Sequence, residues 1–253
     1  MPAISDPSRR IVISVDMADY SKRNNWLQYE AQKDFHRIMD EAAEELAVDR
    51  PAWMQQQAGD GELAVLPAEA SERALVAKLT PTLDKLLRQH NLGRSPAGRV
   101  RLRVAIHQGL VHLDGSNGFP GEAVVTVSRL VDSPVIKDAL RNRFPHADVA
   151  LIVSDQLYND VVCQYHDLRP DLFQKVLAEL PDKGFAQPAW LYVPNENAAQ
   201  DGAREQSPRP DDPSPSEAGT SKPPPVQRWD HNKASGPTIF GNHGTQNLGR
   251  GPR

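Results

Sequence analysis

The sequence predicts an α+β domain of the ferredoxin-like order βαββαβ, followed by a C-terminal tail without a core. Between residues 8 and 195, short runs of β-branched residues alternate with segments whose apolar residues recur at helical spacing. The composition changes near residue 195. Nine of the 22 prolines follow that point, with few large apolar residues. Such a segment buries too little surface to offset its chain entropy, so we expect residues 196–253 to be disordered.

The first half of the predicted domain contains the β-α-β-β part. Residues 10–16 are rich in Ile and Val and predict a buried strand. Residues 25–47 place their large apolar side chains near a helical period, which predicts an amphipathic helix. Asp-Gly is a strong signal for a tight hairpin turn. Strands at 53–58 and 62–66 are therefore expected on either side of the turn Gly59-Asp60-Gly61.

The second half continues the alternation of helices and strands. Residues 69–90 predict a helix with leucines on one face, and Pro81 inside it is expected to kink or restart it. A long strand region is expected over 99–113, and a helix over 121–141 that breaks near Ser133-Pro134. The remaining elements are a strand at 148–153, a helix at 154–162 with Ser154 as N-cap, and a last strand at 188–193.

Composition and charge exclude several classes of function. The chain has 253 residues, a net charge of -4 and a pI near 6.1, so it lacks the basic footprint of a general nucleic-acid binder. Cys163 is the single cysteine, which excludes an intrachain disulfide. The chain has no secretory apolar segment and no apolar run near the ~20 residues of a membrane helix. We therefore expect a cytoplasmic protein without direct membrane insertion.

Two aspartates stand at the ends of strand-like runs. Asp16 follows the apolar run 11–15, and Asp60 lies in the predicted hairpin turn beside two glycines. Each alone has an ordinary structural explanation, either a strand-end cap or a favoured turn residue. A pair of carboxylates beside small residues is also what holds divalent cations against a phosphate. Together Asp16 and Asp60 predict a two-metal site.

Three blocks in this order resemble the class III nucleotidyl cyclase catalytic domain, over roughly residues 8–195. The blocks are Asp16-Met17-Ala18-Asp19-Tyr20-Ser21, the turn around Asp60, and the strand–helix stretches 101–109 and 121–130. The resemblance implies that Asp16 and Asp60 hold two Mg²⁺ or Mn²⁺ ions. It also implies that Arg129 contacts the phosphates of a nucleoside triphosphate from the opposite subunit of a homodimer. In that reaction the ribose 3'-hydroxyl attacks the α-phosphorus and pyrophosphate leaves.

The resemblance also implies contacts to the triphosphate from the loop after the first strand, at Met17, Tyr20 and Ser21. The chain departs from the family pattern at two positions. Asp19 replaces a glycine, and its carboxylate has to point away from the phosphates. Val125 replaces the asparagine that orients the ribose, and a valine side chain forms no hydrogen bond. These departures favour the alternative of a cyclase-like module that binds nucleotide without turnover.

Neither of the base-reading sets of purine cyclases is present. Gln56 and Gly118 occupy the two positions, and Trp53 on the strand of Gln56 either narrows the base pocket or packs in the core. In this the chain resembles the standalone pyrimidine cyclases of the Pycsar antiphage systems. The glutamine amide both donates and accepts, so it suits uracil or cytosine. We expect a uridylate cyclase that makes cyclic UMP from UTP, with CTP, ATP or GTP as the alternatives.

Two further features complete the sequence. His107 in the strand 99–113 is expected to be a structural core histidine. Residues 236–249 combine an apolar pair with Asn, Gln and Gly, and read either as low-complexity tail or as a short cross-β signalling motif. A downstream effector responsive to the cyclic nucleotide and a role in antiphage defence are implied by the resemblance alone.

Overall fold

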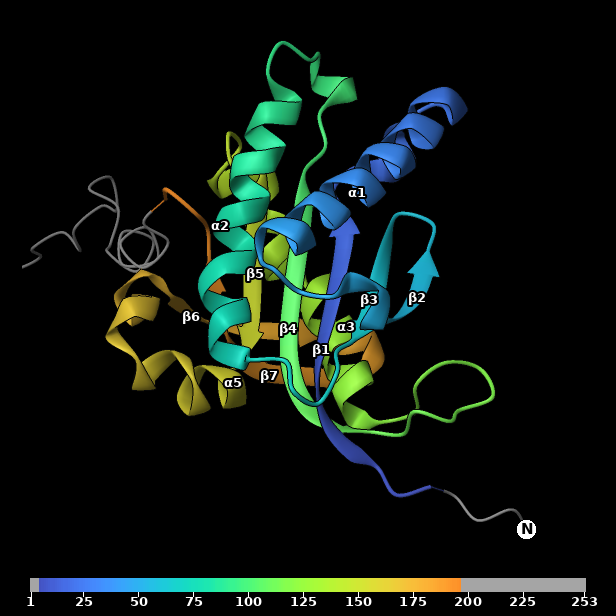
Figure 1. The fold of residues 1–253 in the computed structure, drawn as a ribbon. Helices are drawn as coiled ribbons and strands as arrows, with labels where there is room; N and C mark the ends of the chain where they lie inside the picture. The colour runs from blue at the N-terminus through green and yellow to red at the C-terminus, as the bar shows by residue number, and fades with distance from the viewer. Residues whose placement is uncertain (1–4, 197–253) are drawn as a thin grey trace, which may run out of the picture. The chain divides into compact units, whose positions relative to one another are not determined.

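A mixed seven-stranded sheet forms the centre of the computed structural model, which describes residues 5–196 (Figure 1). The strands follow the order β2-β3-β1-β4-β5-β7-β6. The strands are β1 (Ser8–Met17), β2 (Met54–Ala58), β3 (Gly61–Val65), β4 (Leu102–Val111), β5 (Val149–Ser154), β6 (Gln174–Leu180) and β7 (Phe185–Tyr192). The α-helices are α1 (Asn25–Glu45), α2 (Glu72–Asn91), α3 (Glu122–Asp132), α4 (Pro134–Asp138) and α5 (Asp155–Asp160). The predicted α+β class and its βαββαβ order are confirmed.

Strand β1 lies inside the sheet and pairs antiparallel with both β3 and β4. The register places Asp16 opposite Gly61 on β3 and opposite Arg103 on β4. Beyond β4 the pairing with β5 is parallel, and β7 and β6 extend the sheet as an antiparallel hairpin. The end of β1 therefore places Asp16 between Arg103 on β4 and the start of β3, directly after Asp60.

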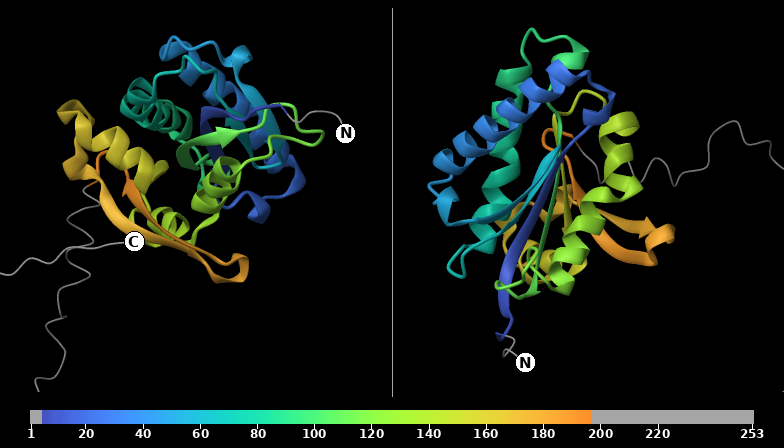
Figure 2. Two further views of the ribbon diagram at one scale, coloured as in Figure 1. Left: turned by 90° about the horizontal axis from the view of Figure 1, so that it is seen from below. Right: turned by 90° about the vertical axis from the view of Figure 1, so that its right-hand side faces the viewer.

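Helices lie on both faces of the sheet, as Figure 2 shows, and each face carries its own hydrophobic core. Helices α1 and α2 cover one face and pack on the odd-numbered residues 11–17 of β1. Helices α3 and α4 cover the other face, where they pack on Val12, Ala18 and Ala105. Because successive strand residues point to opposite faces, Asp16 belongs to the α3 side of the sheet.

Several local predictions are confirmed and three need correction. Ser154 caps α5, accepting a hydrogen bond from the Leu157 N–H at 3.2 Å, and the helical region after residue 121 breaks at Ser133-Pro134. Pro81, however, lies within an uninterrupted α2. It is exposed, so the carbonyl that it leaves without a donor can bond to water. Strand β6 was not predicted, and β7 begins at Phe185 rather than at residue 188.

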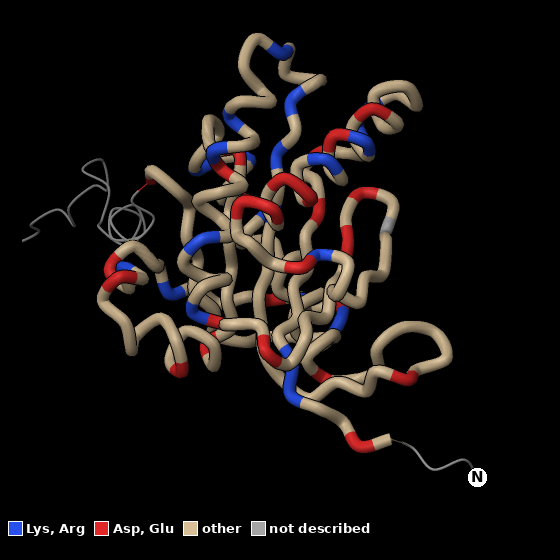
Figure 3. Tube along the Cα trace, in the orientation of Figure 1, with Lys and Arg blue, Asp and Glu red and all other residues tan. Residues whose placement is uncertain are grey.

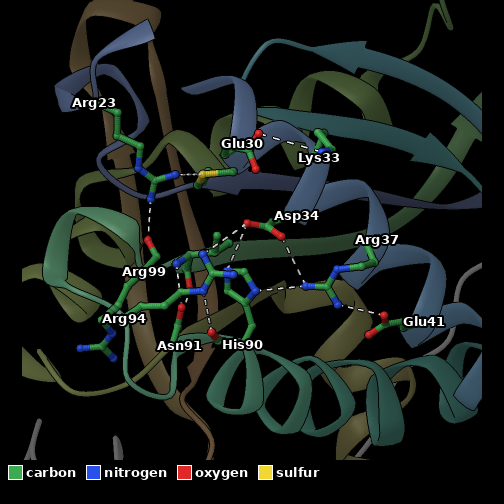
Figure 4. A network of polar contacts seen from close by, with 12 residues as sticks. Arg23, Glu30, Lys33, Asp34, Arg37, Glu41, His90, Asn91, Arg94 and Arg99 are labelled. Carbon is green, nitrogen blue, oxygen red and sulfur yellow. Dashed lines mark hydrogen bonds and ion pairs between the residues drawn. The ribbon is translucent and has the colours of Figure 1, made fainter. Parts of the chain in front are cut away.

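A polar network joins α1 to α2 and to the chain that follows α2 (Figure 4). Asp34 lies 3.5 Å from Arg37 Nη2 and 3.5 Å from His90 Nε2. Arg37 also contacts His90 Nδ1 at 3.0 Å. Burial lowers the pKa of His90, which favours a neutral ring beside Arg37. These contacts fix the position of α1, along which acidic and basic residues are interspersed (Figure 3).

Two predictions concern parts of the chain outside this fold. The expected tail, apart from its first residue, and the motif at 236–249 lie outside the described residues. Within residues 5–196, no helix combines the length and apolar character required to cross a bilayer.

Candidate active site

Asp16 is held by a bidentate ion pair at the end of β1. Its two carboxylate oxygens accept hydrogen bonds from Arg103 Nε at 2.6 Å and Nη2 at 2.9 Å. Burial raises the pKa of Asp16, the hydrogen bonds and charge of Arg103 oppose that effect, and the charge of Asp60 adds to it. Asp60 is thus one of the charged groups that act on the Asp16 carboxyl.

Asp60 is brought beside Asp16 by the backbone of the β2–β3 turn. The Met17 N–H donates to the Asp60 carbonyl at 2.8 Å, next to the β1–β3 pairing of Asp16 with Gly61. A Cβ on Gly61 would lie 2.0 Å from the Val15 carbonyl oxygen, so only glycine permits this approach. The Asp60 carboxylate itself forms no hydrogen bond or ion pair within residues 5–196. It is free to accept a ligand.

The loop after β1 turns sharply at Asp19, whose φ of 57° is in the left-handed region. Its carboxylate pairs with Lys22 at 2.6 Å and lies 3.8 Å from Arg141. The hydrogen bond from Lys22 lowers the pKa of Asp19. The positive side chains of Lys22 and Arg141 therefore offset the negative charge of Asp19, which stands where the family pattern has a glycine.

The predicted substrate residues of this loop have different surroundings. Met17 is 1% exposed and packs in the α1–α2 core, and its N–H is already bonded to Asp60. We therefore correct the prediction for Met17, because neither its side chain nor its N–H is free to contact a phosphate. Ser21 is exposed, and the Tyr20 hydroxyl accepts a hydrogen bond from Gln32 at 2.9 Å.

Arg129 and Val125 lie one turn apart on the outer side of α3. Val125 is 45% exposed, which is high for a large apolar residue. Arg129 is half-buried and forms no hydrogen bond or ion pair with the part of the chain that the structure describes. Arg129 is thus an unpaired guanidinium beside an exposed apolar side chain.

The two predicted base-reading positions are in contact. Gly118, with φ of 99°, lies so close to Gln56 that a Cβ at 118 would be 2.7 Å from the Gln56 Oε1. Gln56 is exposed, and its amide forms no hydrogen bond within residues 5–196. It lies on the α3 side of the sheet, since Met54, two residues earlier on β2, packs against the α3 core.

Trp53 lies on the other face of the sheet from Gln56. It is 6% exposed in the α1–α2 core, with the Arg50 guanidinium 5.5 Å from its ring. This placement corrects the prediction of a base-pocket role and favours the packing alternative. Trp53 also lines a cavity of about 360 Å³ between the end of α1 and the start of α2.

His107 is a buried core residue whose Nδ1 lies 2.8 Å from the Ser154 hydroxyl oxygen. Burial lowers its pKa to about 4, so the ring is neutral at physiological pH. The structural interpretation of His107 is therefore confirmed.

Arg103 is the residue that the sequence interpretation missed. It lies in the stretch 101–109 that carried the resemblance, but its role depends on the β1–β4 register that places it opposite Asp16. The neighbouring Arg101 faces different partners, donating to the carbonyls of Ala147 at 2.9 Å and Leu140 at 2.5 Å. In the sequence, Arg101 and Arg103 are two arginines of the same predicted strand, and nothing there indicates which of them pairs with Asp16.

The donor set at this site fits Mg²⁺ or Mn²⁺. Both are hard cations that bind carboxylate oxygens, and Mg²⁺ commonly uses one or two carboxylates together with substrate phosphates. Asp16 and Asp60 supply two such carboxylates on adjacent elements. Within residues 5–196, no group of three or more His, Cys, Asp or Glu could form a complete protein cage for a metal. A cation at this site therefore requires oxygen ligands from water or substrate.

Comparison with solved structures identifies the fold. The chain is similar to an adenylate/guanylate cyclase/hydrolase from Silicibacter pomeroyi, at 19% identity and a TM-score of 0.54, covering 76% of this chain and 100% of that one. It is also similar to the catalytic core of a rhodopsin-guanylyl cyclase with converted specificity in complex with ATPαS, at 16% identity and a TM-score of 0.51, with 76% and 100% covered. No model of a known protein family matches the chain, and no curated protein matches it.

Proposed function

We propose that this chain is a nucleotidyl cyclase that converts a pyrimidine nucleoside triphosphate, preferably UTP, into the 3',5'-cyclic monophosphate and pyrophosphate. The single observation that carries the proposal is the convergence of Asp16 and Asp60 through the Asp16–Gly61 register and the Met17–Asp60 hydrogen bond. The cyclase fold of the solved neighbours supports the same reaction class. The role in antiphage defence and the cyclic-nucleotide effector rest on the Pycsar resemblance alone.

The proposed reaction is an in-line displacement at the α-phosphorus. The ribose 3'-oxygen forms the new bond and loses its proton, and the bond to the pyrophosphate oxygen breaks. Bound divalent cations supply a lowered pKa for the 3'-hydroxyl and charge neutralisation for the triphosphate. Asp16 and Asp60 would provide the carboxylates that hold those cations, and the exposed Ser21, in the loop after Asp16, would contact the phosphates. The protein contributes mainly position and charge.

Base selection in this proposal depends on Gln56 and Gly118. The Gln56 amide is unbonded and exposed on the α3 side of the sheet, so it can pair with the mixed donor–acceptor edge of a pyrimidine. Gly118 lies against the Gln56 amide, and its φ of 99° is a backbone conformation that residues with a side chain rarely adopt. A single adaptable amide replaces the pair of residues that purine cyclases use.

Incubation with each of the four ribonucleoside triphosphates and Mn²⁺, with products identified by mass, tests the proposal. We expect cyclic UMP to form fastest, cyclic CMP next, and the purine products more slowly. Gln56→Leu removes both hydrogen-bonding groups at similar size and should reduce the preference for pyrimidines. Faster formation of cyclic AMP than of either pyrimidine product would contradict the base assignment, although not the cyclase assignment.

The unpaired Arg129 supports a composite site in a homodimer, with Arg129 of one copy reaching the phosphates held by Asp16 and Asp60 of the other. In a symmetric pair, each interface then contains two equivalent sites. We expect Arg129→Ala and Asp60→Ala to be inactive separately. Mixed, they should recover about a quarter of wild-type turnover, because half of the dimers are mixed and each mixed dimer keeps one intact site of two.

The mixing measurement needs its own control for subunit exchange. Differently tagged copies of the two variants, isolated as a mixed dimer through both tags, remove the uncertainty in the proportions. An isolated mixed dimer without activity would show that Arg129 and Asp60 do not act across an interface.

A nucleotide-binding module without turnover is the second candidate. The observation that favours it is Val125, which leaves the ribose-orienting position on α3 without a hydrogen-bonding side chain. Such a module would bind UTP and metal but release no pyrophosphate. The four-nucleotide incubation distinguishes the two candidates when it is paired with equilibrium binding of UTP.

A further inference from the structure

We propose that Gln32 on α1 is a positioning residue that ties together the two loops carrying the metal aspartates. The inference rests on the proposed function, because it concerns the same Asp16–Asp60 site. Gln32 touches neither aspartate. It acts through the backbone of the Asp60 turn and through Tyr20 in the loop that follows Asp16.

The geometry of the Gln32 amide connects both loops. Its Nε2 donates to the Gly59 carbonyl at 2.6 Å and to the Tyr20 hydroxyl oxygen at 2.9 Å. An amide nitrogen has two N–H groups, so both are used. Gln32, Gly59 and Asp60 also line one small cavity of about 180 Å³ at this point. The contact to Gly59 is one residue away from the Asp60 carboxylate.

The Asp60 turn has little other support. It joins β2 to β3, and β2 is an edge strand of the sheet. The Asp60 side chain has no hydrogen-bonding partner among residues 5–196, so its position depends on the turn backbone. The Met17 N–H holds the turn from β1, and Gln32 holds it from α1. Loss of the second contact should let the carboxylate move away from Asp16.

Helix α1 gives Gln32 a fixed base. The network in Figure 4 joins Asp34, two residues after Gln32, to Arg37 and His90. The apolar side of the helix is buried through Phe35 and Ile38. A side chain on a rigid helix can hold a turn more precisely than one on a loop.

The test measures Mn²⁺ binding without nucleotide, by electron paramagnetic resonance, beside steady-state kinetics. Gln32→Leu removes both hydrogen bonds and keeps the helix propensity. Loss of a partner that orients a metal ligand usually costs about 10- to 100-fold in affinity or activity. We expect Mn²⁺ affinity to fall by about that factor, with kcat reduced more than KM is raised.

The chain offers a matched control and two graded variants. Gln28→Leu is the same substitution one turn earlier, where the amide donates at 3.0 Å to the Arg23 carbonyl and not to the Asp60 turn. It should leave Mn²⁺ affinity unchanged. Gln32→Met has nearly the same length, no N–H donors and no charge, and should be as defective as Gln32→Leu. Tyr20→Phe removes one acceptor, keeps the Gly59 contact, and should show a smaller loss.

The outcomes separate this inference from the function on which it rests. Weaker Mn²⁺ binding in Gln32→Leu and Gln32→Met, at an unchanged melting temperature and with Gln28→Leu intact, supports the positioning role. If Asp60→Asn weakens Mn²⁺ binding and both Gln32 variants bind normally, the positioning role is overturned and the metal site stands. If Asp60→Asn also binds Mn²⁺ normally, the metal site itself fails, and with it the positioning role.

Discussion

Replacing Asp60 with asparagine should reduce cyclisation by at least about 1,000-fold while leaving the fold intact. Metal-held charge stabilisation supplies several kcal/mol to such reactions, and each ~1.4 kcal/mol is a factor of ten in rate. The Asp60 carboxylate forms no hydrogen bond within the described chain, so its loss breaks no structural contact. Pyrophosphate release from UTP with Mn²⁺, together with a thermal melt, measures both parts of this expectation.

Asp16→Asn should be as inactive as Asp60→Asn, but its loss of activity is harder to interpret because the substitution also affects stability. It leaves the buried Arg103 guanidinium without its anionic partner, so some destabilisation is expected. Asp182→Asn, at an exposed position beyond β6, serves as the matched control and should be fully active. Turnover of Asp60→Asn within a few-fold of the wild type would rule out a metal role for this carboxylate.

Breaking the Arg50–Glu62 ion pair should give the largest loss of stability among single polar substitutions. Arg50 Nη1 and Nη2 donate to the two Glu62 oxygens at 2.9 and 2.8 Å, and the two side chains are 7% and 1% exposed. Removing Arg50 leaves the buried Glu62 carboxylate without a counter-ion and should cost about 3–5 kcal/mol. Removing Glu62 should cost less, because Arg50 Nε keeps the largely exposed Asp40 as a partner at 2.6 Å. Urea denaturation of Arg50→Ala and Glu62→Ala should show these decreases in the free energy of unfolding.

Replacing both residues distinguishes the cost of an unpaired buried charge from the contribution of the ion pair itself. Arg50→Met with Glu62→Leu leaves no charge behind, so its stability should lie much nearer to the wild type than either single variant does. Arg169→Ala is the surface comparison: its pair with Asp171 is 60% and 62% exposed, so breaking that pair should lower the free energy of unfolding far less than breaking the Arg50–Glu62 pair. A loss below about 1 kcal/mol in Arg50→Ala would contradict the expected penalty.

The sequence could predict those features that depend on local pattern. The hairpin around Asp60 was predicted from one Asp-Gly pair between two apolar runs, and the end of β1 from its β-branched residues. Strand β6 was missed because it is an edge strand whose residue types do not follow its alternating burial: Leu177 is exposed, and the small Ala178 is its one buried residue. Pro188 lies within β7, the partner of β6, and a proline inside a run weakens the prediction of a strand there.

Those parts of the site that depend on register and on sheet face could not be predicted locally. Trp53 and Gln56 lie three residues apart on or beside one strand, so they point to opposite faces of the sheet. Alternation along the strand already separates the two side chains, but only the structure shows which face of the sheet α1 and α2 cover and which face α3 covers. Arg103 likewise gains its partner from strand pairing, and Gln32 from the packing of α1 across the hairpin.

The pairing of β1 with β4 also determines when the site can form during synthesis. Asp16 and Arg103 are 87 positions apart, and the pairing of β1 with β4 is the register that joins them. The entropy of closing a loop of that length is lost before the contact contributes any stabilisation, so such pairings form late in folding. On the ribosome, a growing chain that ends before β4 contains the residues of the Asp60 hairpin but not Arg103, so Asp16 lacks this counter-ion. Strand β1, which carries Asp16, therefore lacks one of its two neighbouring strands until more than a hundred residues have been translated.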